Sequence, residues 1–141
     1  MTGCLVDTNI PSELTREKPD GRVLAFLRNW DKGRVFLCVM TIGEIYKGIA
    51  AFPTSQRRTS LQDWLDVDVR SWFAGRVLPV AEAIAERWER LAKIAKEEGL
   101  TLAVVDCVIA ATALHHGLAL VTRNVKDFAG LGVKISNPRE T

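Results

Sequence analysis

The stretch CLVDTN, residues 4–9, joins a short apolar run to three polar residues, of which Asp7 is the first. An apolar run of this kind is typical of a strand that is buried on both faces of a sheet. Asp7 adds nothing to the packing of such a strand, and two roles can explain it. It can cap the turn or helix that follows, because Asp is a favoured N-cap residue. Alternatively, it can belong to a ligand site, because open α/β sheets bind ligands just outside the carboxyl ends of their strands.

Outward from this stretch, short apolar runs alternate with helical patterns. Strands are predicted at residues 4–6, 34–40, 75–80, 118–122 and 133–136. Helices are predicted at residues 11–14, 22–30, 41–52, 55–73, 81–99 and 104–117. Thr41 is a plausible N-cap of its helix, and Gly99 and Gly117 are expected to end theirs. The alternation predicts an α/β fold, with a central parallel sheet of about four to five strands flanked by helices on both faces.

The bulk composition indicates an ordinary globular protein. A chain of 141 residues with 48% apolar and 26% charged residues is expected to form a single domain, residues 1–141. No apolar stretch approaches the roughly 20 residues of a membrane span, and no signal peptide opens the chain, so a cytoplasmic protein without membrane contact is expected. The net charge of +2 permits nucleic-acid binding without indicating it. Cys4, Cys38 and Cys107 lie far apart in apolar surroundings, which favours buried free thiols over a disulfide or a zinc site.

Three carboxylates are distinguished from the rest because each follows an apolar segment. Asp7 ends the first strand, Glu44 lies in the first turn of the predicted helix 41–52, and Asp106 lies near the start of the predicted helix 104–117. A carboxylate near a helix N-terminus can be explained alone by the helix dipole, at about 0.3–1 kcal/mol. The helix dipole does not explain why all three acids follow apolar, buried segments on the same side of a parallel sheet.

If these carboxylates meet, they would protonate or move apart unless a cation lies among them. Two carboxylates ~5 Å apart repel by about 3 kcal/mol at an effective dielectric constant of 20. An all-oxygen site suits Mg²⁺ or Mn²⁺, and no thiolate or imidazole is positioned to join it. A site of this kind performs phosphate chemistry, because the ion activates water and stabilises the attacking and leaving oxygens. Convergence itself does not follow from these residues alone.

Three segments occur in an order and spacing that characterise one known family. They are LVDTNIPSEL (residues 5–14), TIGEIYKGI (41–49) and VVDCVIAATALHHGLALVTRNVKDF (104–128). Together they resemble the motifs of PIN-domain ribonucleases, and specifically the VapC/FitB-like toxins of bacterial type II toxin–antitoxin systems. The acids of the family map onto Asp7, Glu44 and Asp106. The resemblance covers nearly the whole chain.

The resemblance implies a PIN-like fold and a magnesium-dependent endoribonuclease toxin that cleaves RNA and is neutralised by a cognate antitoxin. Asp7, Glu44 and Asp106 are then the catalytic and metal-binding residues, with Mn²⁺ as an alternative ion. The residues expected to orient these carboxylates are Thr8, Asn9, Ser12 and Thr122. The candidates for contact with RNA phosphates are Arg57, Arg58, Arg123 and Lys126, each of which can also be an ordinary surface charge.

One position departs from the family pattern. The family often carries a fourth acid two residues after the Thr of the late strand, where this chain has Asn124, with Asp127 three residues further on. Whether Asn124, Asp127 or neither completes the site stays open. An alternative is therefore a catalytically weak or dead PIN fold that acts as a nucleic-acid or protein-binding module. A receiver-like or phosphohydrolase domain fits less well, because VDTN has no second Asp two residues on.

Partner binding is expected on two amphipathic segments. The predicted helices 22–30 and 41–52 carry more large apolar side chains than one small core needs, with Trp30, Tyr46 and Phe52 as candidate anchors. By resemblance, an antitoxin segment lies along such a groove with a basic side chain near the acids, and the toxin forms a homodimer. The alternative, that these aromatic residues belong to the core, is equally consistent with the sequence.

Overall fold

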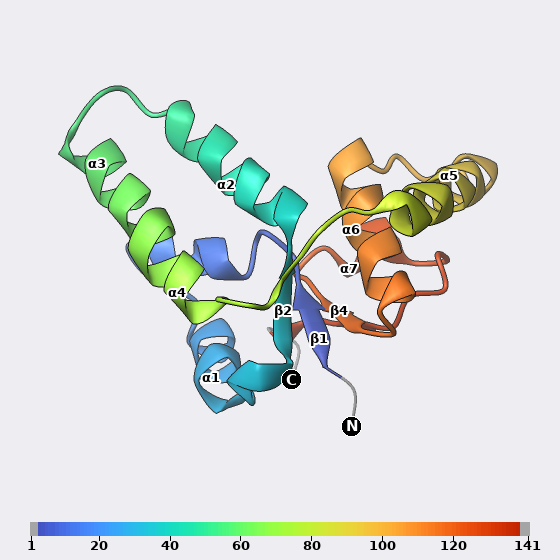
Figure 1. Cartoon of the computed structure of the whole chain (residues 1–141), viewed down its shortest axis with the longest axis horizontal. Helices are drawn as coiled ribbons and strands as arrows, with labels where there is room; N and C mark the ends of the chain where they lie inside the picture. Colours follow the sequence, from blue (N-terminus) through green and yellow to red (C-terminus); the bar gives the residue numbers. More distant parts are fainter. Residues whose placement is uncertain (1–2, 139–141) are drawn as a thin grey trace.

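The computed structural model of the protein describes residues 3–138 and contains a five-stranded parallel sheet (Figure 1). The strands are β1 (Cys4–Val6), β2 (Val35–Cys38), β3 (Val77–Leu78), β4 (Ala119–Val121) and β5 (Ile135–Ser136). They lie in the order β3-β2-β1-β4-β5, and every neighbouring pair is parallel. The predicted fold class is therefore confirmed. The predicted domain, residues 1–141, also includes residues 1–2 and 139–141, which lie outside the described range.

The alternation of side chains along the strands separates two hydrophobic cores, one on each face of the sheet. In β1, Cys4 and Val6 belong to one core and Leu5 belongs to the other. Val121 and Leu120 divide in the same way in β4. Successive side chains of a strand point to opposite faces, and apolar residues on both faces are what a sheet covered by helices requires.

Helices cover both faces of the sheet, as predicted. The helical segments are η1 (Pro11–Thr15), α1 (Gly21–Asn29), η2 (Lys32–Arg34), α2 (Val39–Ala50), α3 (Gln56–Asp63), η3 (Trp64–Val69), α4 (Arg70–Trp72), α5 (Glu82–Glu97), α6 (Val104–His115) and α7 (Val125–Phe128). Buried residues of α1, α2, α3 and η3 fill the first core, and those of α5, α6 and α7 fill the second. In Figure 1, α2 and α3 form one arm above the sheet, and α5 and α6 stand opposite.

Three details differ from the prediction. Strand β2 ends at Cys38 and α2 begins at Val39, so Thr41 is a buried residue inside the helix and not its N-cap. Glu44 consequently lies in the second turn of α2 and not in the first. The apolar residues 39–40 fit the apolar run of the strand as well as the pattern of the helix, and a short apolar run does not distinguish a strand from a buried helix. The short helix α7 also lies where no helix was expected, and η3 interrupts the predicted helix 55–73 with π-helical turns.

Several local predictions are confirmed. Gly99 and Gly117 follow α5 and α6 with positive φ angles of 71° and 65°, which residues other than glycine rarely adopt. The three cysteines are buried and free, and burial raises the pKa of the Cys4 thiol to about 12. Between residues 3 and 138, no helix is long and apolar enough to cross a membrane.

Candidate metal centre

The candidate site lies where the strand order of the sheet reverses. From β1 the chain continues to β2 and β3 on one side of the sheet, whereas β4 and β5 lie on the other side. Asp7 follows β1 directly, and its backbone N–H donates to the carbonyl oxygen of Val121 in β4 at 2.8 Å. A crevice outside the carboxyl ends of two such strands is the usual ligand site of an open α/β sheet. The fold therefore places Asp7 where a ligand is expected.

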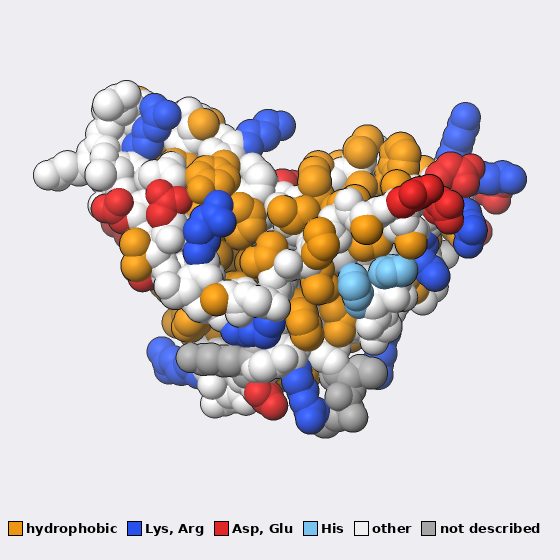
Figure 2. Space-filling model, viewed as in Figure 1, with side chains coloured by type: hydrophobic (Ala, Val, Ile, Leu, Met, Phe, Trp, Pro, Cys, Tyr) orange, Lys and Arg blue, Asp and Glu red, His pale blue; other side chains and the backbone are white. Residues whose placement is uncertain are grey.

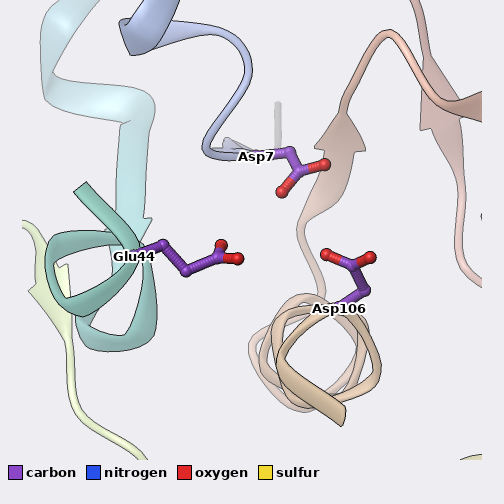
Figure 3. Close-up of side chains that lie close together, drawn as sticks. All are labelled: Asp7, Glu44 and Asp106. Carbon is purple, nitrogen blue, oxygen red and sulfur yellow. The ribbon is translucent and has the colours of Figure 1, made fainter. Parts of the chain in front are cut away.

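Glu44 and Asp106 join Asp7 in this crevice (Figure 3). Glu44 reaches in from α2, Asp106 reaches in from the first turn of α6, and the three side chains point toward one another. One carboxylate oxygen of each residue lies within 4.8 Å of the others. Asp7 is buried, and the other two are half-buried. The convergence that the sequence left open is therefore present in the fold.

Asp7 is held by a set of hydrogen bonds. The Thr122 hydroxyl donates to Asp7 Oδ2 at 2.8 Å, and the Thr8 backbone N–H donates to Asp7 Oδ1 at 2.8 Å. The Asn9 side-chain amide lies 3.4 Å from Asp7 Oδ2 and 3.2 Å from Thr122 Oγ1. Both oxygens of the carboxylate thus have a donor, which fixes its orientation before any ligand binds.

Glu44 and Asp106 are held less firmly. The Thr8 hydroxyl donates a hydrogen bond to Glu44 Oε1 and also lies 3.4 Å from the hydroxyl of Thr41. Thr41 was expected to cap a helix, and its proximity to this contact follows from the earlier start of α2. Within the described part of the chain, the Asp106 carboxylate accepts no hydrogen bond, although it faces two other carboxylates.

Burial and mutual repulsion raise the pKa of two of these carboxyl groups. For Asp7, burial is the largest cause, the hydrogen bonds from Thr122 and Thr8 act in the opposite direction, and the charges of Glu44 and Asp127 add to the rise. The pKa of Asp106 is raised from 3.8 to about 6, first by burial and then by the charges of Asp7, Glu44 and Asp127. A divalent cation among the three oxygens would remove this repulsion, and hard oxygen donors are the ligands that Mg²⁺ and Mn²⁺ prefer. The donor set therefore fits such an ion.

The other residues expected near the acids occupy distinct positions. Thr8, Asn9 and Thr122 contact the acids as described above. Ser12, in η1, lines a groove of about 170 Å³ that also contains Thr8 and Glu44. Asn124 is exposed before α7, and its backbone N–H donates to Thr122 Oγ1 at 3.0 Å. Asp127 lies within α7, outside the group of three carboxylates, yet close enough for its charge to raise the pKa of Asp7 and Asp106.

The four basic candidates lie on two parts of the chain, with Arg57 and Arg58 in α3, Arg123 after β4 and Lys126 in α7. Arg57 is exposed and donates to the carbonyl oxygen of Thr15 at 2.6 Å, Arg58 is half-buried, and Lys126 is exposed on α7. Arg123 donates to Glu13 at 2.9 Å. Sequence analysis missed the role of Glu13, whose only signal is a carboxylate in an otherwise uncharged segment, PSEL.

The aromatic candidates divide between core and surface. Trp30 is half-buried, with its ring 5.2 Å from that of Phe26. Tyr46 is half-buried, and its hydroxyl donates to Asp66 at 3.0 Å. Phe52 is 41% exposed and lines the same groove as Glu44. In Figure 2, hydrophobic side chains gather in the hollow between the arm formed by α2 and α3 and the opposite helices.

The sequence is similar to that of known toxins over nearly the whole chain. Residues 4–133 match the profile of the PIN domain family. The chain is 37% identical over 136 residues to VapC ribonuclease Y4jK of Sinorhizobium fredii, covering 96% of this chain and 97% of that protein. It is 34% identical over 134 residues to Toxin FitB of Neisseria gonorrhoeae, covering 95% of this chain and 96% of that protein.

The fold is similar to that of solved toxin–antitoxin structures. The crystal structure of FitAcB from Neisseria gonorrhoeae matches with a TM-score of 0.92 at 33% identity, covering 98% of this chain and 99% of that chain. A toxin–antitoxin complex from Klebsiella pneumoniae matches with a TM-score of 0.69 at 28% identity, covering 96% of this chain and 98% of that chain. Some of these similar structures are bound to DNA.

Proposed function

The chain belongs to the PIN-domain family, and within it to the VapC/FitB toxins of type II toxin–antitoxin systems; from this premise we propose that it is a metal-dependent endoribonuclease. The observation that carries the proposal is the meeting of Asp7, Glu44 and Asp106 within 4.8 Å. Three ionised carboxylates at that distance repel one another, and a cation among them would relieve this repulsion. The family name supplies the reaction class, which is RNA cleavage.

The residues of the site have separate tasks in this proposal. Asp7 and Asp106 hold the ion, which is Mg²⁺ in the first instance, and Thr122 keeps the Asp7 carboxylate in a fixed orientation. When bound, the ion supplies Lewis-acid chemistry to water and to the scissile phosphate. Glu44 borders the groove beside the acids, where it can accept a proton from the attacking water. Arg57, Arg58 and Lys126 are candidates for contact with RNA phosphates, whereas the side chain of Arg123 donates to Glu13.

The enzyme proposal is tested by cleavage of RNA by the purified protein with Mg²⁺, with Mn²⁺ and with EDTA. We expect cleavage that EDTA abolishes and that added Mg²⁺ restores. Expression of the protein alone should arrest growth, and Asp7→Ala should relieve the arrest. RNA binding without metal-dependent cleavage would instead support the alternative of a catalytically dead binding module.

We further propose a cognate antitoxin and a homodimer. The groove beside Glu44 also contains the exposed side chain of Phe52, so an antitoxin segment lying in it would block access to the acids. A basic side chain of that segment would be attracted to the three carboxylates. The protein copurified with its antitoxin should cleave RNA more slowly than the protein alone. Phe52→Ala should weaken this inhibition. Light scattering of the isolated protein tests the dimer, and a monomer at micromolar concentration would contradict it.

A further inference from the structure

Glu13 is a buried carboxylate outside the group of three acids. It lies in η1 with 1% of its surface exposed, which makes it more deeply buried than Asp7. Its Oε2 accepts a hydrogen bond from Arg123 Nη1 at 2.9 Å, and its Oε1 accepts one from the backbone N–H of Asp20 at 2.7 Å. Arg16 lies 3.4 Å away and is largely exposed. Among residues 3–138, Arg123 therefore makes a shorter side-chain contact with this carboxylate than Arg16 does.

Arg123 is connected to the metal centre through its backbone. It follows Thr122, whose hydroxyl donates to Asp7. The backbone N–H of Arg123 donates to Asn9 Oδ1 at 3.3 Å, and the amide of Asn9 lies 3.2 Å from the Thr122 hydroxyl. The turn after β4 is thus attached to residues 7–13 at three points, which are Asp7, Asn9 and Glu13.

Stability alone is a weak reason for a buried ion pair, because apolar residues of similar volume often serve as well or better. A short, charge-assisted hydrogen bond also fixes the orientation of the two side chains that form it. We propose that Glu13 is a positioning residue, which fixes Arg123 and thereby holds the Thr122 hydroxyl against Asp7. Arg123 then acts within the protein and not on the RNA. This inference rests on the proposed metal-dependent function.

The test compares Glu13→Gln with Arg123→Gln, because the second variant removes the same contact from its half-exposed side. We expect each variant to bind Mn²⁺ about threefold to thirtyfold more weakly by calorimetry, below or within the range for residues that orient metal ligands. RNA cleavage should show a lower kcat at an unchanged KM for RNA, and excess Mg²⁺ should restore kcat. Arg123→Lys, which keeps the charge, should lose less.

A double-mutant cycle separates positioning from general stability. If Glu13 acts through Arg123, the double variant should bind Mn²⁺ no more weakly than either single variant. Val69→Ala, a buried core substitution on η3, should lower the melting temperature without changing Mn²⁺ affinity. Unchanged Mn²⁺ affinity in both single variants, or a raised KM for RNA in Arg123→Gln, would overturn the inference while leaving the proposed function intact. A wild-type protein that binds no divalent cation would overturn both.

Discussion

Two carboxylates of one site are supported in opposite ways. Asp7 is buried and accepts hydrogen bonds from Thr122 and Thr8, so the protein itself determines its orientation. Asp106 is half-buried, accepts no hydrogen bond from the residues that the structure describes, and has a pKa raised to about 6. The orientation of the Asp7 carboxylate is therefore fixed before any ion binds. The Asp106 carboxylate is repelled by its neighbours, and a cation would relieve this repulsion. We infer that Asp7 determines the geometry of the site, whereas the ionisation state of Asp106 determines how strongly the site attracts a cation.

The largest effects are expected when either carboxylate is neutralised. Asp7→Asn and Asp106→Asn should each reduce RNA cleavage by more than about 100-fold, because each replaces a charged carboxylate of the proposed metal site with a neutral amide, and such losses exceed those of supporting residues. Their stabilities should differ. Asp106→Asn should raise the melting temperature of the metal-free protein because it relieves repulsion. Asp7→Asn relieves repulsion as well, but an amide can accept only part of the hydrogen bonds that Asp7 accepts, so the melting temperature should change little. A large fall in melting temperature with cleavage intact would show that the acids are structural.

Removal of the support of Asp7 is expected to have the next largest effect. Thr122→Val removes the hydroxyl that donates to Asp7 Oδ2 and should weaken Mn²⁺ binding by about tenfold. Thr122→Ser retains the hydroxyl and serves as the matched control. Calorimetric titration of both variants measures the difference. Equal affinities in the two would mean that Asp7 needs no orientation by Thr122.

The raised pKa of Asp106 should make both stability and ion binding depend on pH. Between pH 3.8 and about 6 the folded state binds more protons at Asp106 than the unfolded chain does, so the stability of the metal-free protein contributed by this group falls as the pH rises. Asp106→Asn should lack this fall. Because protons compete with the ion, the affinity of the wild type for Mn²⁺ should decrease below about pH 6, by up to about tenfold per pH unit for one titrating group. Thermal unfolding with and without Mn²⁺ at several pH values measures both effects.

The smallest effects are expected around the missing fourth acid. Asp127→Ala should change Mn²⁺ affinity only a few-fold, because Asp127 influences the acids through its charge without belonging to the group of three. Asn124→Asp should tighten Mn²⁺ binding, because it adds a carboxylate next to the site. We predict one firmly bound ion in the wild type. Two tight sites in the wild type, or an Asp127→Ala variant as inactive as Asp7→Ala, would contradict this prediction.

Asp7 could be predicted from the sequence because it follows the buried strand β1, whereas the residues before Asp106 are exposed or half-buried and not buried as expected, with Val104 64% exposed. Asp7 follows a strand that reads clearly in the apolar pattern, and the order of motifs supplied Glu44 and Asp106. The boundary at Val39 could not be predicted, since the apolar run continues from β2 into α2 without interruption. That error moved Thr41 from the helix interior to its cap. Local patterns identify elements well, and their exact ends less well.

The contacts that support the acids could not be predicted for a different reason. Glu13 and Arg123 are 110 residues apart, and Thr8 and Glu44 are 36 residues apart. A single sequence carries no distances, so neither pair is distinguishable from ordinary surface charge and polarity. Asp127 shows the same limit, because the helix α7 that carries it was not expected.

The central place of β1 in the sheet has a consequence for synthesis. Its neighbours are β2 on one side and β4 on the other, and β4 contributes the carbonyl oxygen that binds the backbone of Asp7. A nascent chain that has emerged from the ribosome only as far as residue 100 contains Asp7 and Glu44 but lacks α6 and β4, and with them Asp106 and Thr122. Domains fold as units when their long-range partners are available. The three carboxylates and the Thr122 hydroxyl therefore cannot come together until α6 and β4 have been synthesised, so the proposed activity has to wait until most of the chain has been translated.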